Sequence, residues 1–132
     1  MRRIIAGIVG IAMAANGLVM LAAGRWWYGA VPGVPQTGPF NPHFVKDIGA
    51  AYLVAGAGLG WLAASGSALA RGAAAAGAAF LALHAGIHLA EAVGDPMGAA
   101  HLGRDFAGVI LPPLLALLAL WPTKPQMETR HA

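Results

Sequence analysis

Four long apolar runs separated by short polar segments dominate the chain. The runs cover residues 4–24, 44–64, 72–93 and 102–121, so each has about 20 residues. A helix of ~20 residues rises ~30 Å, which is the thickness of the hydrocarbon core of a bilayer. The pattern predicts four transmembrane helices within a single domain of 132 residues. We therefore expect an all-α fold, an integral membrane four-helix bundle.

Polar and proline residues predict where these helices begin and bend. Asn41 is followed by a proline, which is typical of an N-cap residue before the first turn of a helix. Pro96 suits the same role in the fourth helix, which we place at about residues 96–121. Pro112 and Pro113 lie inside this helix, so they should kink it and free carbonyl groups of the preceding turn.

The basic residues predict the orientation of the bundle. Five fall on one side and three near the other: Arg2, Arg3, Arg71, Lys124 and Arg130 against Arg25, Lys46 and Arg104. Because cytoplasmic loops are enriched in Lys and Arg, we expect both termini in the cytoplasm, with residues 25–43 as an outer loop and 122–132 as a tail. The first run is longer than the apolar part of a typical signal peptide, so we expect a retained helix.

Composition supports a membrane protein and excludes several other classes. Hydrophobic residues make up 58% of the chain, charged residues 10%, and the mean hydropathy is +0.67. The absence of cysteine excludes disulfides, thiolate metal sites and dithiol chemistry. No basic cluster carries interleaved aromatic residues, so we expect no nucleic-acid partner. Arg outnumbers Lys six to two in a chain rich in Ala and Gly, which suggests a GC-rich bacterial genome and a bacterial inner membrane.

Three ionisable residues interrupt the third apolar run, in the stretch HAGIHLAEA. His84, His88 and Glu91 have i, i+4 and i+7 spacing, so they lie on one narrow stripe of a helix. Such groups near the bilayer centre cost at least ~2.5–3.5 kcal/mol each, so they should face one another, a cavity or a cation. The stripe is therefore a candidate functional site.

Two further pairs with i, i+4 spacing occur at the outer ends of the second and fourth helices. His43 and Asp47 lie in HFVKD, and His101 and Asp105 lie in HLGRD. The predicted topology brings both pairs and the third-helix stripe to the outer half of the membrane. A divalent metal is the simplest group that satisfies several carboxylates and neutral imidazoles together.

We therefore expect a metal site at the outer end of the bundle. Imidazole and carboxylate ligands without thiolate suit Zn, Fe, Mn or Cu(II). The candidates suffice for a dinuclear centre, or for one metal with carboxylates that orient histidine rings. Haem is less favoured, although His88 could pair with His43 or His101 as axial ligands. The seven candidate ligands are His43, Asp47, His84, His88, Glu91, His101 and Asp105.

Structural interpretations of the same residues stay open. His84 could bond a backbone carbonyl or Asn16 of the first helix. Glu91 could be an interfacial charge on the last turn of its helix. Asp47 and Asp105 could form salt bridges with basic residues of the outer end, namely Arg25, Lys46 and Arg104. These groups would then form an ion-pair or proton network rather than a metal site.

The outer loop carries aromatic residues that fit two roles. Trp26 and Trp27, followed by Tyr28, stand where the aromatic belt of a membrane protein belongs. The loop is rich in Pro and Gly, and it could fold over the bundle mouth as a lid. Phe40 and the two tryptophans would then line a pocket for an apolar substrate or quinone. A passive linker is the alternative.

The chain also resembles a known family in its general topology. Four short helices, a charged start of the second helix (HFVKDIGAAY) and packing by small residues are similar to the DoxX-type family of small bacterial membrane proteins. That family includes a subunit associated with quinone-linked sulfur oxidation, so the resemblance implies a redox or accessory role. It carries over no catalytic residue.

Three functional hypotheses follow. The first is a metal-dependent oxidoreductase that acts on a membrane-soluble substrate or quinone, or a hydrolase in which Glu91, Asp47 or Asp105 is the general base. The second is a non-catalytic accessory or metal-binding subunit of a larger membrane complex or homo-oligomer. The third is a proton-relay or ion-pair bundle without metal.

Overall fold

The structure is a computed structural model that describes residues 1–122, and over this range it is all-helical. The elements are α1 (Arg2–Ala30), a 3₁₀ helix η1 (Val34–Thr37), α2 (Pro42–Ser65), α3 (Ala68–Ala92), α4 (Gly98–Asp105), a π-helical segment η2 (Phe106–Ile110) and α5 (Leu111–Leu120). The last three are continuous and form one span. Four helices are thus long and apolar enough to cross a membrane, which confirms the predicted fold class. Residues 123–132, with Lys124 and Arg130 of the predicted tail, lie outside the described range.

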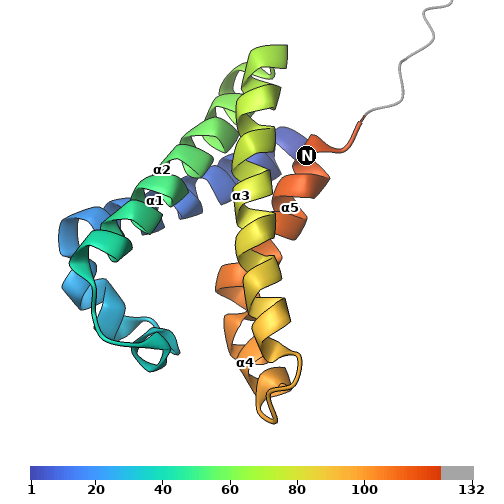
Figure 1. Ribbon diagram of the computed structural model, residues 1–132. Helices are drawn as coiled ribbons and strands as arrows, with labels where there is room; N and C mark the ends of the chain where they lie inside the picture. Colours follow the sequence, from blue (N-terminus) through green and yellow to red (C-terminus); the bar gives the residue numbers. More distant parts are fainter. Residues whose placement is uncertain (123–132) are drawn as a thin grey trace, which may run out of the picture.

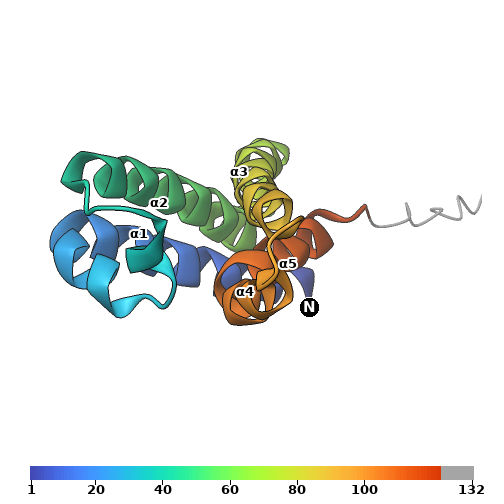
Figure 2. The same ribbon diagram turned by 60° about the horizontal axis from the view of Figure 1, so that its bottom comes forward.

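The helices form two arms that join at one end and separate at the other (Figure 1). The first arm is the hairpin of α1 and α2 with η1, and the second arm is α3 with α4, η2 and α5. At the closed end, the turn between α2 and α3 lies near the start of α1 and the end of α5. At the open end, η1 and α4 occupy the tips of different arms, and Figure 2 shows the same separation from another side.

Glycine contacts hold the first arm together. A Cβ atom on Gly17 would lie 2.5 Å from Gly49 O, and a Cβ on Gly56 would lie 2.6 Å from Gly10 O. Neither position could take a side chain without moving a backbone, so these glycines allow α1 and α2 to pack closely. The buried core continues from this contact through large side chains such as Met20 and Leu59 to the alanine-rich face of α3.

α1 extends further than the sequence pattern predicts, and it bends. The predicted loop of residues 25–43 starts only after Ala30, because α1 continues through the aromatic stretch. The backbone is non-helical at Ala23 (φ −136°, ψ 41°), and the last turns of α1 change direction there. Trp27 Nε1 donates to Asn16 Oδ1 at 2.9 Å across this kink. The side chain of Asn16 is therefore used within α1 and not by His84.

The two prolines of the fourth span widen the helix just before them. Pro112 and Pro113 have no backbone N–H, so the carbonyl groups four residues earlier lose their partners. The residues before them adopt π-helical geometry, and Leu111 N–H bonds to Phe106 O, five residues back. Both prolines are buried. The predicted disturbance is thus present as a wide turn, and that turn begins directly after Asp105.

Candidate functional site

The stripe on α3 exists as predicted, with its three members in different environments. His84 and His88 are half-buried neighbours whose ring centroids lie 5.0 Å apart. Glu91, nearly one turn further toward the open end, is exposed. The i, i+4 spacing thus places the two imidazoles side by side, while the carboxylate of the stripe faces the surroundings.

His88 is joined to the fourth span by a charged network. His88 Nδ1 lies 3.0 Å from Asp105 Oδ2, and these side chains are only 25% and 10% exposed. Arg104 donates to the same carboxylate twice, from Nε to Oδ1 at 2.6 Å and from Nη2 to Oδ2 at 3.0 Å. The predicted alternative in which Asp105 pairs with Arg104 is therefore present together with a histidine–carboxylate contact.

Aromatic rings connect this network to the first arm. The ring of His84 lies 5.7 Å from Tyr52 of α2 and 6.2 Å from Phe80 of α3, measured between centroids. Tyr52 and Phe80 pack edge to face at 5.3 Å, and Tyr52 is buried. Neither aromatic residue was among the site residues predicted from the sequence, because the sequence around each resembles an ordinary core position of its helix. His84 is the point where the polar groups meet the apolar core.

His101 forms a different pair from the one that its spacing suggests. Its Nδ1 lies 2.8 Å from Oδ2 of Asp95, in the turn that follows α3. Asp95 also accepts a hydrogen bond from Met97 N through its other oxygen. The expectation that His101 acts with Asp105 is wrong, because Asp105 is occupied by His88 and Arg104. The pair of His101 and Asp95 closes the tip of the second arm.

His43 and Asp47 lie on the first arm, apart from the other candidates. Their contact is 3.4 Å from Nε2 to Oδ2, and the side chains are 88% and 61% exposed. Within residues 1–122, no group of three or more His, Asp or Glu side chains is close enough to hold one metal ion. The predicted convergence of all seven candidates is therefore wrong. It fails because the start of α2, which carries His43 and Asp47, and α4, which carries His101 and Asp105, lie on separate arms at the open end.

The predicted lid folds onto its own arm. Tyr28 donates to the carbonyl groups of Pro35 and Gly38 and packs against Phe40, with 5.3 Å between ring centroids. Trp27 and Phe40 both pack against the buried core, whereas Trp26 is exposed. One point of this loop approaches the second arm: a Cβ on Gly33, whose φ is 90°, would lie 2.6 Å from Arg104 Nε.

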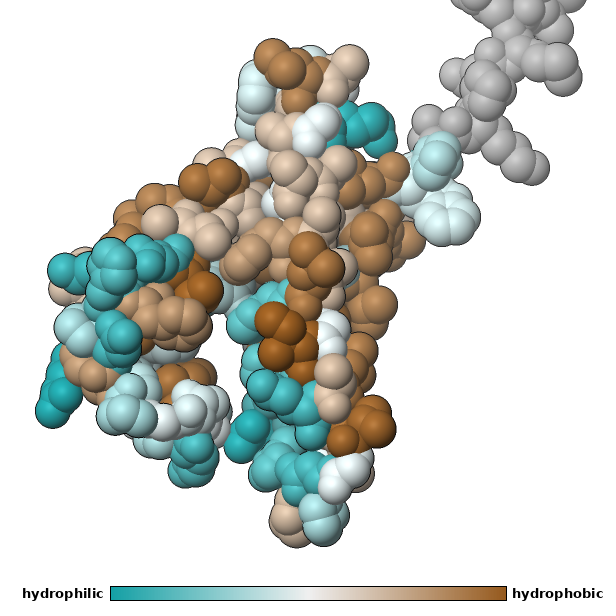
Figure 3. Space-filling model, in the orientation of Figure 1, coloured by the Kyte–Doolittle hydropathy of each residue, from teal (hydrophilic) through white to brown (hydrophobic). Residues whose placement is uncertain are grey.

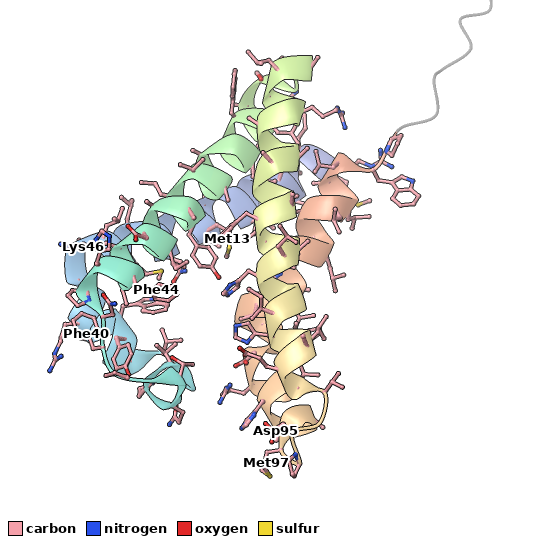
Figure 4. All side chains as sticks on the ribbon, in the orientation of Figure 1. Met13, Phe40, Phe44, Lys46, Asp95 and Met97 are labelled. Atoms are coloured by element: carbon pink, nitrogen blue, oxygen red, sulfur yellow. The ribbon has the colours of Figure 1, made fainter. Side chains whose placement is uncertain are left out.

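A cleft separates the arms, and its two walls differ in polarity. Figure 3 shows hydrophilic side chains gathered along the edge of the second arm that faces the cleft. The network described above approaches the first arm at two places, at Tyr52 where the arms begin to separate and at Gly33 near the open end. Figure 4 places Asp95 at the tip of the second arm and the apolar side chain of Met13 near the junction of the arms. Polar groups thus follow the second arm along the cleft to its tip.

No protein-family model, curated protein or solved structure matches this chain. The resemblance to DoxX-type proteins stays a prediction.

Proposed function

We propose that this chain is a multi-pass protein of the bacterial inner membrane that binds a membrane-soluble ligand, a quinone or another apolar substrate, in the cleft between its arms. The contact of His88 with Asp105 at 3.0 Å is the observation that supports this proposal most strongly. The pair lies within two candidate spans and beside the cleft between the arms, which supports entry of a lipid-soluble molecule from the bilayer.

The chemistry of the pair suits a ligand with a hydroxyl or carbonyl group. Asp105 favours the tautomer in which His88 Nδ1 carries the proton, so Nε2 is left to accept a hydrogen bond. Nε2 can take a proton from a ligand hydroxyl, and the resulting imidazolium can donate to a carbonyl oxygen. Arg104 balances the carboxylate charge in this low-dielectric position. Tyr52 and Phe80 offer aromatic surface to the apolar part of the ligand.

A divalent metal is a second candidate ligand, supported by the spacing of the two histidines. Two imidazoles bound to one tetrahedral ion at ~2.0–2.1 Å have ring centroids about 5 Å apart. His84 and His88 have centroids 5.0 Å apart, and Asp105 is positioned to orient the ring of His88. Zn, Fe or Cu would suit these ligands, and Fe or Cu would give the site the redox role of an oxidoreductase.

The experiment compares two histidine–carboxylate pairs of the same chain. His88→Gln and Asp105→Asn change the cleft pair, whereas His43→Gln and Asp47→Asn change the exposed pair of the first arm. Binding of a short-chain ubiquinone analogue is followed by quenching of tryptophan fluorescence in detergent. Loss of a hydrogen bond to a charged group should weaken binding about 10-fold in the cleft variants alone. Equal affinity in all four variants would refute the ligand proposal.

Metal content separates the two candidates. Protein purified without a polyhistidine tag is analysed for Fe, Cu, Zn and Mn, with His84→Gln beside the variants above. One equivalent of metal that is lost in His84→Gln and His88→Gln, and kept in His43→Gln, would support a metal site. Absence of both metal and quinone binding would favour a non-catalytic accessory subunit whose partner fills the cleft.

A further inference from the structure

Three arginines surround a pocket at the closed end, opposite the cleft. Arg2 and Arg3 of α1 and Arg71 of α3 line a cavity of about 300 Å³, together with Ser65 and Gly66 of the turn between α2 and α3. The cavity lies where all four spans begin or end, which is the depth of the lipid headgroups if these helices cross a bilayer.

Hydrogen bonds to helix ends fix the three guanidinium groups in place. Arg2 Nη1 donates to Trp121 O at 2.5 Å, and Arg71 Nη1 donates to Leu120 O at 3.1 Å. Arg3 donates from Nε to Ala63 O at 2.8 Å and from Nη2 to Ala64 O. The acceptors are backbone carbonyls at the ends of α2 and α5: Ala63, Ala64, Leu120 and Trp121. Each guanidinium has five N–H donors, so most donors of each arginine stay free for another acceptor.

No carboxylate within residues 1–122 balances these charges. The four acids of this range, Asp47, Glu91, Asp95 and Asp105, all belong to the open half of the molecule. The pocket also adjoins the start of α3, where the positive end of a helix dipole favours an anion. Three fixed cations with free donors around one cavity favour an anionic partner with several acceptor oxygens.

We propose that this pocket binds the phosphate group of an anionic phospholipid headgroup. Phosphate offers the planar guanidinium groups paired oxygen acceptors, and anionic lipids concentrate at the cytoplasmic surface, where the count of basic residues predicts this end to lie. The acyl chains would follow the apolar surfaces of α1 and α5 into the bilayer. This site is independent of the cleft and of any ligand bound there.

Native mass spectrometry from detergent tests the proposal by counting bound lipid. Wild-type protein is titrated with phosphatidylglycerol, with phosphatidylcholine and with inorganic phosphate. Phosphatidylglycerol should bind at least 10-fold more tightly than phosphatidylcholine, and Arg2→Gln with Arg71→Gln should remove this preference. Arg25→Gln with Lys46→Gln removes two cations at the open end and should leave the preference unchanged. Arg71→Gln alone loses one backbone contact and keeps the test valid if the double variant does not fold.

Three outcomes would overturn the proposal. The first is equal binding of the two lipids, and the second is an unchanged preference in the arginine variants. In the third, inorganic phosphate competes fully with phosphatidylglycerol at equal concentration, which would assign the pocket to a free phosphate. Glu128 lies outside the described residues, and Glu128→Gln tests whether the chain supplies its own anion. An increase in lipid affinity in that variant would still support the pocket as an anion site.

Discussion

Replacement of Gly56 by alanine should loosen the first arm, whereas the same change at Gly60 should not. The two glycines lie one turn apart on α2. A Cβ on Gly56 would lie 2.6 Å from Gly10 O and 2.9 Å from Ala14 Cα, both backbone atoms that cannot rotate away. A Cβ on Gly60 would meet nothing within 4 Å. The two substitutions add the same atom to the same helix and differ only in what that atom contacts.

The magnitudes favour opposite outcomes. Each substitution removes a helical glycine, which should stabilise the helix by up to ~1 kcal/mol. Gly56→Ala also overpacks a close helix contact, which typically costs ~1–3 kcal/mol. Because the helix term is common to both variants, it cancels in their difference. The free energy of unfolding should therefore be ~1–3 kcal/mol lower for Gly56→Ala than for Gly60→Ala.

Unfolding in mixed micelles of increasing dodecyl sulfate content, followed by circular dichroism, measures this difference. Gly60→Ala should match the wild type or exceed it slightly, and Gly56→Ala should unfold at lower dodecyl sulfate content. Equal transitions for the two variants would mean that α1 and α2 do not approach each other through Gly56. The account of how the first arm packs would then be wrong.

Two smaller predictions use the same assay. Asn41→Ala should lower the free energy of unfolding by ~1 kcal/mol, because Asn41 Oδ1 accepts from two backbone N–H groups of the first turn of α2. Asn41→Asp keeps a side-chain acceptor at this position and should retain the wild-type stability. Equal losses of stability in the two variants would contradict the capping role of Asn41. Gly33→Ala should lower the free energy of unfolding by ~1–2 kcal/mol, because a φ of 90° disfavours a side chain and Arg104 occupies the space that the Cβ would fill. A Cβ on Gly29 would meet nothing within 4 Å, so Gly29→Ala is the control. A similar loss in Gly29→Ala would contradict this explanation.

Local sequence patterns predicted the features that depend on one helix at a time. Four spans, the N-cap at Asn41 and the stripe of His84 and His88 follow from hydropathy, capping chemistry and a period of 3.6 residues. The extension of α1 beyond Gly24 was missed, because a polar aromatic stretch with prolines after it resembles a loop. The hydrogen bond from Trp27 to Asn16 supports those extra turns, and hydropathy carries no sign of it.

The relative placement of the helices could not be read from the sequence. The predicted topology put both His–Asp pairs and the α3 stripe in the outer half of the membrane, but it gave no angle between the helices. Near the closed end, glycine lets α2 and α3 touch: a Cβ on Gly77 would lie 2.9 Å from Ala55 Cα. Toward the open end, small residues give way to the rings of Tyr52, Phe80 and His84. The change from glycine to aromatic contacts is where the arms begin to separate.

This separation has an energetic consequence for whatever occupies the cleft. Lipid tails cannot satisfy the imidazole and carboxylate groups of His88 and Asp105, and burial of such groups in hydrocarbon without polar partners is costly. Arg104 compensates part of that cost by neutralising Asp105, but within residues 1–122 the other ring nitrogen of His88, Nε2, has no hydrogen-bond partner and would need one in hydrocarbon. In a bilayer the cleft must therefore hold water, a ligand with a polar group, or a segment of a partner protein. An occupant that brings a hydrogen-bonding group to His88 and apolar surface to Tyr52 would satisfy both walls at once, and the proposed membrane-soluble ligand has both features, whereas water has only the first.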